Sequence, residues 1–272
     1  MKVRLPPELV LTVLVLLCAT ACAEQPPTNP TPESYQRFLK LRGYEFNEKA
    51  FLAAVAVNDS TAVDGFISAG VNPNAKDAET GASALILAAT KDELEVVQVL
   101  LHGGADVNLK DNFGYTATLR ALQYDHDEIA ELLVEQPGLD VNAQAQRAPT
   151  VLMSYAWRGR EDLVKKLLSL GANPNLTDPG GDTALHGAAQ VGSVPMTTML
   201  LKAGANPNAK NKVGGTPLMW AGVYGRADVA RALLDGGAKA ELKDEDGVTA
   251  AVWAARNNWS AVAQLLRAAE KH

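Results

Sequence analysis

Gly171-Ala172-Asn173-Pro174-Asn175 and Gly204-Ala205-Asn206-Pro207-Asn208 are two copies of one pentapeptide, 33 residues apart in a chain of 272. Close variants occur six times in all, and the steps between successive glycines are 34, 34, 33, 33 and 33 residues. These glycines are Gly70, Gly104, Gly138, Gly171, Gly204 and Gly237. A constant period of this length is typical of stacked supersecondary units, which bury their apolar faces only against one another. The sequence therefore predicts a repeat protein with an extended surface rather than an enzyme pocket.

A second motif opens each unit, and a clear copy is Gly214-Gly215-Thr216-Pro217-Leu218-Met219-Trp220-Ala221-Gly222. Its threonine stands where a first helix should begin and can accept free backbone N–H groups. The same position holds Thr116, Thr150, Thr183, Thr216 and Thr249. Leu-Leu pairs such as Leu233-Leu234 supply the apolar stripe of a second helix. The glycine pentapeptide should then end that helix, and its last asparagine should tie the turn that follows.

These features together resemble the ankyrin repeat, whose signature is T-P-L-H-x-A on a 33-residue period. The resemblance covers about residues 47–272 and implies an all-α fold, an α-solenoid of about seven helix–turn–helix repeats with short β-hairpin or loop fingers. The repeats are expected at about 47–80, 81–113, 114–147, 148–180, 181–213, 214–246 and 247–272, after an N-terminal capping helix at 34–46. His186 stands in the signature histidine position, for which the resemblance implies a structural hydrogen bond between turns.

The N-terminus predicts export. Lys2 and Arg4 precede an apolar run of about 13 residues, against the roughly 20 that a membrane-spanning helix needs. This pattern is typical of a secretory signal, here residues 1–22. Residues 23–33 contain four prolines and are expected to form a stiff, unpacked tether.

Two cleavage sites remain open. Ala19-Thr20-Ala21-Cys22 resembles a bacterial lipobox, in which Cys22 would carry the lipid, although Leu usually stands at the position of Ala19. The alternative is the A-x-A site Ala21-Cys22-Ala23, with cleavage before Glu24 and no lipid. We expect a periplasmic protein that is membrane-anchored as a lipoprotein through Cys22.

Charge and motifs argue against nucleic-acid binding and catalysis. The net charge is −6 without a block of Lys or Arg, so a nucleic-acid partner is not expected. The histidines His102, His126, His186 and His272 lie at unrelated positions, and both cysteines, Cys18 and Cys22, precede the repeats. Nucleotide-binding and hydrolase fingerprints are missing as well. We predict no catalytic residue, cofactor or metal, and hence no enzyme.

The resemblance implies that hairpin tips and one face of the first helices form a concave binding surface. Trp, Tyr and Arg are enriched at interface hot spots, so aromatic residues and arginines at positions that the fold should expose are the candidates for partner binding. They are Phe113, Tyr115, Tyr124, Trp157, Arg158, Tyr224 and Arg256. The first five come from adjacent copies and would form one patch. The alternative is that the rings pack on neighbouring repeats, as is expected of Trp220 and Trp253.

The predicted function is a non-catalytic protein–protein interaction module of the bacterial cell envelope. It would be monomeric and would bind another exported, periplasmic protein on its concave face. The alternative is an immunity or inhibitor protein that neutralises a toxin enzyme acting in the periplasm, since an acidic chain would suit a basic toxin.

Overall fold

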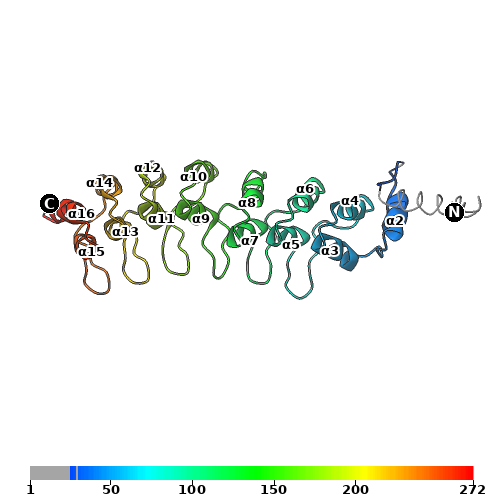
Figure 1. Ribbon diagram of the computed structural model, residues 1–272, viewed down its shortest axis with the longest axis horizontal. Helices are drawn as coiled ribbons and strands as arrows, with labels where there is room; N and C mark the ends of the chain where they lie inside the picture. Colours follow the sequence, from blue (N-terminus) through cyan, green and yellow to red (C-terminus); the bar gives the residue numbers. More distant parts are fainter. Residues whose placement is uncertain (1–24, 29, 272) are drawn as a thin grey trace, which may run out of the picture. The chain divides into compact units, whose positions relative to one another are not determined.

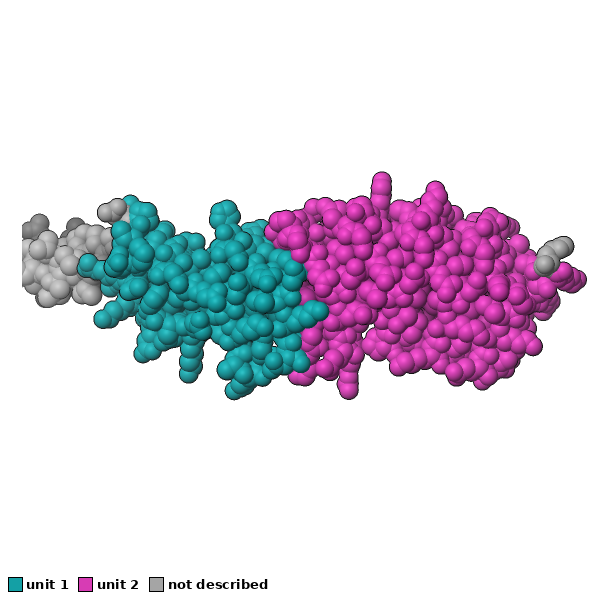
Figure 2. Space-filling view, turned by 180° about the vertical axis from the view of Figure 1, so that it is seen from behind, with its two compact units in different colours: residues 1–112 teal, residues 113–272 magenta. Residues whose placement is uncertain are grey.

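The computed structural model describes residues 25–28 and 30–271. These residues form fifteen α-helices and no strand, with one isolated antiparallel bridge between Lys76 and Ser83. The chain divides between Asn112 and Phe113 into two compact units, residues 1–112 and 113–272 (Figure 2). The predicted all-α fold is confirmed. The expected signal peptide and Cys22 lie outside the described residues, and none of the described helices has the length and apolar character needed to cross a membrane.

Unit 1 contains two helix pairs and one further helix at its N-terminal side (Figure 1). The helices are α2 (Pro32–Leu41), α3 (Glu48–Ala56), α4 (Ser60–Ser68), α5 (Ala84–Thr90) and α6 (Leu94–His102). First helices pack on first helices (α3 on α5) and second helices on second helices (α4 on α6). Helix α2 packs on α4, where the buried Phe38 lies close to Gly65. Helix α2 therefore packs on the second helix of the first pair.

Helix α2 begins two residues earlier than the sequence predicted. Thr31 is its N-cap and shares a capping box with Ser34, while Pro32 occupies the first turn. Proline suits that position because its fixed φ is helical and no N–H is needed there. The end of the expected tether at 23–33 is thus helical.

Unit 2 contains five helix pairs (Figure 1). Its first helices are α7 (Ala117–Gln123), α9 (Val151–Trp157), α11 (Ala184–Val191), α13 (Pro217–Val223) and α15 (Ala250–Arg256). Its second helices are α8 (Asp127–Val134), α10 (Glu161–Ser169), α12 (Val194–Lys202), α14 (Ala227–Asp235) and α16 (Ser260–Ala269). The first helices form one row and the second helices another, and the long loops project from the row of first helices. The seven pairs in the described residues match the expected number of repeats.

The recurring threonines start the first helices of unit 2, as predicted. Each is the N-cap residue, and the hydroxyls of Thr116, Thr150 and Thr216 accept a backbone N–H three residues on. Such a cap is worth about 1 kcal/mol. Pro217 stands in the first turn of α13, where its lack of an N–H costs nothing.

The asparagine that closes each pentapeptide does not act as the sequence suggested. Asn175 accepts the backbone N–H of Asn206 at 2.8 Å and donates to the carbonyl of Gly204 at 2.8 Å, so it bonds the next repeat. The residue two positions before it, Asn173, accepts the N–H of Asn175 and so ties the local turn. Asn142 and Asn208 repeat the two bonds of Asn175. The expectation that this asparagine ties the turn that directly follows it is wrong, because its amide bonds the end of the second helix in the next repeat.

The core of unit 2 is a column of leucines beside a column of small residues. One leucine of each second helix is fully buried, namely Leu133, Leu167, Leu200, Leu233 and Leu266. The facing first helices place Ala121, Ala188, Ala221 and Ala254 at one common position, and α9 places the buried Tyr155 there. Small residues at this position allow the close helix approach that the repeat needs.

Candidate protein-binding surface

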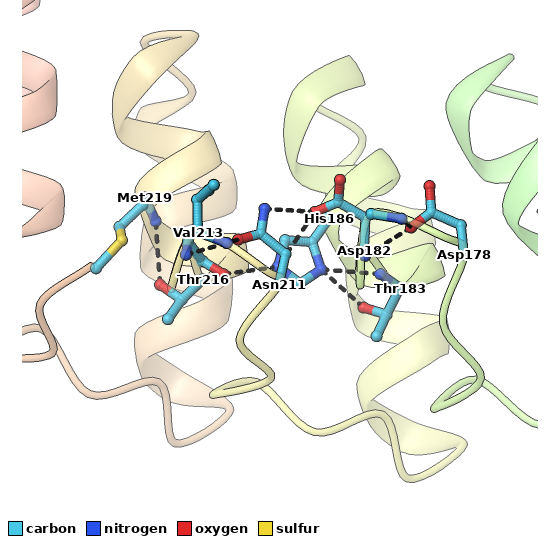
Figure 3. A network of polar contacts seen from close by, with 10 residues as sticks. Asp178, Asp182, Thr183, His186, Asn211, Val213, Thr216 and Met219 are labelled. Carbon is cyan, nitrogen blue, oxygen red and sulfur yellow. Dashed lines mark hydrogen bonds and ion pairs between the residues drawn. The ribbon is translucent and has the colours of Figure 1, made fainter. Parts of the chain in front are cut away.

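The long loops and the first helices of unit 2 together form one surface, which we call the hairpin face. It consists of the loop tips, such as Val213, and of the outward side of the first helices, such as Trp220. His186 fixes one of its loops from beneath (Figure 3). The buried imidazole accepts the N–H of Thr183 at Nδ1 (3.0 Å) and lies 3.2 Å from the carbonyl of Gly215 through Nε2. Burial lowers the pKa of His186, although the nearby Asp182 opposes the shift. The structural hydrogen bond expected of His186 is confirmed.

Polar side chains hold the loop tips in fixed turns. Asp178 accepts the N–H groups of Gly180 and Asp182, and Asn211 accepts that of Gly215 (Figure 3). The amide of Asn211 also donates to Asp182 at 2.9 Å, which joins two successive loops. The loop tips are therefore preorganised rather than free to collapse.

The hairpin face is hollowed at the repeat that begins near Gly214. Val213, Trp220, Tyr224 and Trp253 line a cavity of about 300 Å³, which we call the aromatic pocket. Trp220 and Tyr224 are stacked, with ring centroids 5.8 Å apart and planes inclined by 14°. Val213 is 62% exposed. The pocket thus presents apolar surface that this chain itself leaves accessible.

Asp244 fixes the third ring of the aromatic pocket. Its carboxylate accepts the indole N–H of Trp253 at 2.7 Å and the backbone N–H of Val248 at 2.8 Å. Burial raises the pKa of Asp244, but the hydrogen bonds from Val248 and Trp253 outweigh it and hold the pKa below its ordinary value. The guanidinium of Arg256 lies 5.3 Å from the Trp253 ring centroid, so Trp253 is held on two sides.

A second hollow lies at the same place in the repeat that begins near Gly114. Phe113, Tyr115, Arg120, Gln146 and Arg147 line a cavity of about 420 Å³, which we call the arginine pocket. Phe113 lies three residues before the N-cap Thr116, and Arg120 lies four residues after it. Val213 and Trp220 have the same positions relative to the N-cap Thr216. The two pockets therefore occupy equivalent positions in their repeats but are lined by different types of side chain.

The structure separates the predicted partner-binding residues into groups. Phe113 (54% exposed) and Tyr115 share the arginine pocket, whereas Tyr224 lines the aromatic pocket and Arg256 lies beside it. Tyr124 is 49% exposed and stacks on His126 outside both pockets. The expected exposure of Tyr115 is wrong, because the guanidinium of Arg120 covers its ring at 3.9 Å and leaves it 8% exposed.

Trp157 and Arg158 bind neighbouring repeats of this chain. The indole of Trp157 lies against Gly187 of the next repeat. Arg158 forms ion pairs with Asp125 and Asp127 and donates to the carbonyl of Leu122, all in the preceding repeat. These contacts correspond to the packing alternative, and the two residues line neither pocket. The expected patch of five residues is thus divided.

Sequence reasoning missed the residues that line the pockets most directly. Trp220 and Trp253 contact the preceding repeat as expected, Trp220 edge-on to His186 and Trp253 through its hydrogen bond to Asp244, but both also line the aromatic pocket, which was not expected. Arg120 was not singled out, although it stands in the same register as Trp220, four residues after the N-cap. The position four residues after the N-cap threonine, shared by Arg120 and Trp220, was the sequence feature that could have identified both as pocket residues.

Comparison with known proteins identifies the repeats. The family "Ankyrin repeats (3 copies)" matches residues 51–145 and 152–244. A putative ankyrin repeat-containing protein of Treponema pallidum is 33% identical over 138 residues, which are 50% of this chain and 46% of that protein. The neurogenic locus notch homolog protein 1 of Danio rerio is 33% identical over 129 residues, 47% of this chain and 5% of that protein. Each match spans less than half of the relative's length.

A solved structure agrees with the fold. The crystal structure of an ankyrin repeat domain from Acinetobacter baumannii AYE is similar with a TM-score of 0.61 and 32% sequence identity. The similarity covers 71% of this chain and 100% of the Acinetobacter chain.

Proposed function

This chain belongs to the ankyrin repeat family, and we propose that it is a protein-binding module of the bacterial cell envelope. Ankyrin repeats generally mediate protein–protein interactions and are typically non-catalytic. The observation that carries the proposal is the aromatic pocket, where Trp220, Tyr224 and Trp253 surround a cavity of about 300 Å³ on the hairpin face. Tryptophan and tyrosine in a desolvated pocket are the residues that contribute most to protein–protein affinity.

The aromatic pocket is prepared to receive an apolar side chain of a partner protein. Trp253 is fixed by Asp244, and Trp220 is stacked on Tyr224, so few rotamers remain to be ordered on binding. Each side chain that is already immobilised saves about 0.5–1.5 kcal/mol of binding free energy. Val213 at the pocket's edge adds exposed apolar area that a partner would cover.

Capture of partner proteins from envelope extracts tests the proposal. Val213→Glu places a charge at the edge of the aromatic pocket and should remove the specific partner. Val57→Glu is the matched control, because Val57 is 68% exposed and lies in unit 1. Both variants should melt like the wild type, since both valines are largely exposed. Identical sets of captured proteins from the two variants would contradict the proposal.

The location in the envelope is supported by the signal-like residues 1–22 and by the lipobox-like segment that ends at Cys22. We propose that the mature protein is tethered through a lipid on Cys22 and that its partner is another exported protein. The intact mass of the mature chain tests this. A diacylated Cys22 supports the tether, a chain that begins at Glu24 supports a free periplasmic form, and an uncleaved chain contradicts export by this signal.

A second candidate function is immunity against a toxin enzyme that acts in the periplasm. The observation that favours it is the net charge of −6, which suits a basic toxin. A deletion strain should then die beside its toxin-producing kin, and normal survival would contradict this function.

A further inference from the structure

Two side chains of the aromatic pocket carry hydrogen-bond donors that the chain itself does not use. The indole N–H of Trp220 and the hydroxyl of Tyr224 make no hydrogen bond to any other residue that the structure describes. The indole is a donor only, whereas the hydroxyl both donates and accepts. The third ring differs, because Trp253 donates its indole N–H to Asp244. Trp220 and Tyr224 are therefore the polar groups that the pocket can offer to a ligand.

The side-chain acceptors around the aromatic pocket are already bonded within the chain. The carboxylate of Asp244 accepts one N–H at each oxygen, from Val248 and from Trp253. The amide oxygen of Asn211 accepts the backbone N–H of Gly215 at 2.7 Å. A ligand N–H that entered the pocket would thus have to share an acceptor that is already in use.

Backbone carbonyls of the lining residues are engaged in the same way. The carbonyl of Val213 accepts the N–H of Glu245 at 3.1 Å, which joins the loop tips of two successive repeats. The carbonyl of Val223 accepts the indole N–H of Trp259 at 3.0 Å. The aromatic pocket therefore favours a ligand that is rich in hydrogen-bond acceptors and poor in donors.

Three kinds of peptide segment differ in what they bring to such a pocket. An extended segment of ordinary residues brings backbone N–H groups, and each one buried without an acceptor costs binding free energy. A helix bonds its own carbonyls, so it would cover the donors of Trp220 and Tyr224 without replacing their bonds to water. A proline-rich segment brings unbonded carbonyls and has no N–H at its prolines. Of the three, the proline-rich segment matches the pocket on both counts.

We propose that the aromatic pocket binds a proline-rich segment of the partner protein in the polyproline II conformation, with a proline ring among the aromatic rings and carbonyls that accept from Trp220 and Tyr224. This inference rests on the proposed function and specifies the chemistry of the partner. Polyproline II is extended and largely preformed, so little ordering is needed on binding, and aromatic-lined grooves suit it. The exposed Val213 continues the apolar surface at the edge of the pocket.

Three labelled peptides test the inference by fluorescence anisotropy on the full chain. The first is decaproline. The second is a decapeptide that alternates Ala with Gln and keeps its backbone N–H groups, and the third is a helical peptide with an apolar stripe of leucines among glutamines. We expect decaproline to bind at least about tenfold more tightly than either of the others. Weaker or equal binding of decaproline, or no binding of it, would overturn the inference, and a preferred leucine peptide would assign a helical partner instead.

A pair of tyrosine variants tests the role of the donor. Tyr224→Phe keeps the ring and removes the hydroxyl, so it should weaken decaproline binding about threefold to tenfold. Its melting curve should be unchanged, because the hydroxyl bonds no described residue of the folded chain. Tyr124→Phe is the matched control, since Tyr124 is exposed and lies outside both pockets. Equal affinities of the two variants for decaproline would contradict the inference.

The valine variants locate the binding and separate this outcome from that of the proposed function. Val213→Glu should abolish decaproline binding, and Val57→Glu should retain it. Should decaproline fail while Val213→Glu still loses the envelope partner that Val57→Glu retains, the proline specificity alone is wrong. Should the two valine variants capture the same envelope proteins, the proposed function itself is contradicted, whatever the peptides do.

Discussion

Trp157 packs its indole directly on Gly187 of the following repeat, where an added Cβ would stand 2.2 Å from the ring's Cδ1 atom. This contact shows why a glycine is needed within α11. It also explains why an aromatic residue that looked available for a partner is half-buried by its own chain.

Gly187→Ala should therefore destabilise the protein. Gly to Ala within a helix usually stabilises by about 1 kcal/mol, whereas overpacking costs about 1–3 kcal/mol. We expect a net loss of about 1 kcal/mol in urea unfolding, together with a red shift of tryptophan fluorescence as the indole moves into water. Gly180→Ala is the control, because its Cβ would meet Asp178 Oδ1 at 3.2 Å and nothing more severe. A stabilised Gly187→Ala protein would show that the indole moves aside at no cost and is available to a partner.

Replacing Asn175 should loosen the contact between two repeats. Asn175→Ala removes both bonds to the loop at 204–206, with a cost of about 1–3 kcal/mol. Asn175→Asp keeps the acceptor for the N–H of Asn206 but places a carboxylate against the carbonyl of Gly204, so it should also destabilise. Denaturant unfolding measures both variants. An Asn175→Asp protein as stable as the wild type would show that the donated bond contributes nothing.

Stability should fall in mildly acidic solution because of His186. Burial lowers the pKa of His186 in the folded protein, so the unfolded chain takes up the proton more readily. The contribution is fully present above the ordinary histidine pKa of about 6.5 and is lost as the pH falls towards the lower folded value. The slope should not exceed about 1.4 kcal/mol per pH unit for one proton.

Unfolding free energies measured at pH 7.5, 6.5 and 5.5 check this expectation. His186→Gln should flatten the profile, whereas His102→Gln, at an exposed histidine on α6, should leave it unchanged. A wild-type profile that is already flat between pH 7.5 and 5.5 would contradict the assignment to His186.

Arg158 should contribute to stability in a salt-dependent way. It pairs with Asp125 and Asp127 of the preceding repeat and donates to the Leu122 carbonyl at 2.8 Å. Arg158→Met keeps much of the apolar stem and should cost about 1 kcal/mol, because exposed ion pairs are individually weak. The loss should shrink in 0.5 M NaCl. An equal loss at both salt concentrations would assign the effect to packing rather than charge.

The repeat architecture could be predicted because it depends on residues with strict local requirements. Backbone geometry alone favours a glycine in the left-handed turn at position 204 and a threonine at the N-cap position 216. These requirements do not depend on which side chains the adjacent repeats contribute. The helix start at Pro32 was missed because a run of prolines suggests a tether, and only the cap at Thr31 shows otherwise.

The binding surface was less predictable because exposure depends on contacts between repeats. Tyr115 is covered by Arg120, which is close in sequence, but Trp157 is covered only because Gly187 lies thirty residues later. Trp220 and Trp253 contact the preceding repeat and also line the aromatic pocket. The position of each ring in the repeat does not show how much of it the adjacent repeat covers, because that depends on the neighbouring side chains.

Site-specific photo-crosslinking in living cells tests the central claim, that the hairpin face of unit 2 holds a partner protein at the aromatic pocket. A benzophenone amino acid replaces Val213 at the edge of the pocket or Leu170, which is 47% exposed at the end of α10. The account predicts a discrete crosslinked adduct from position 213 and none from position 170. No adduct from position 213, or the same adducts from both positions, would contradict it.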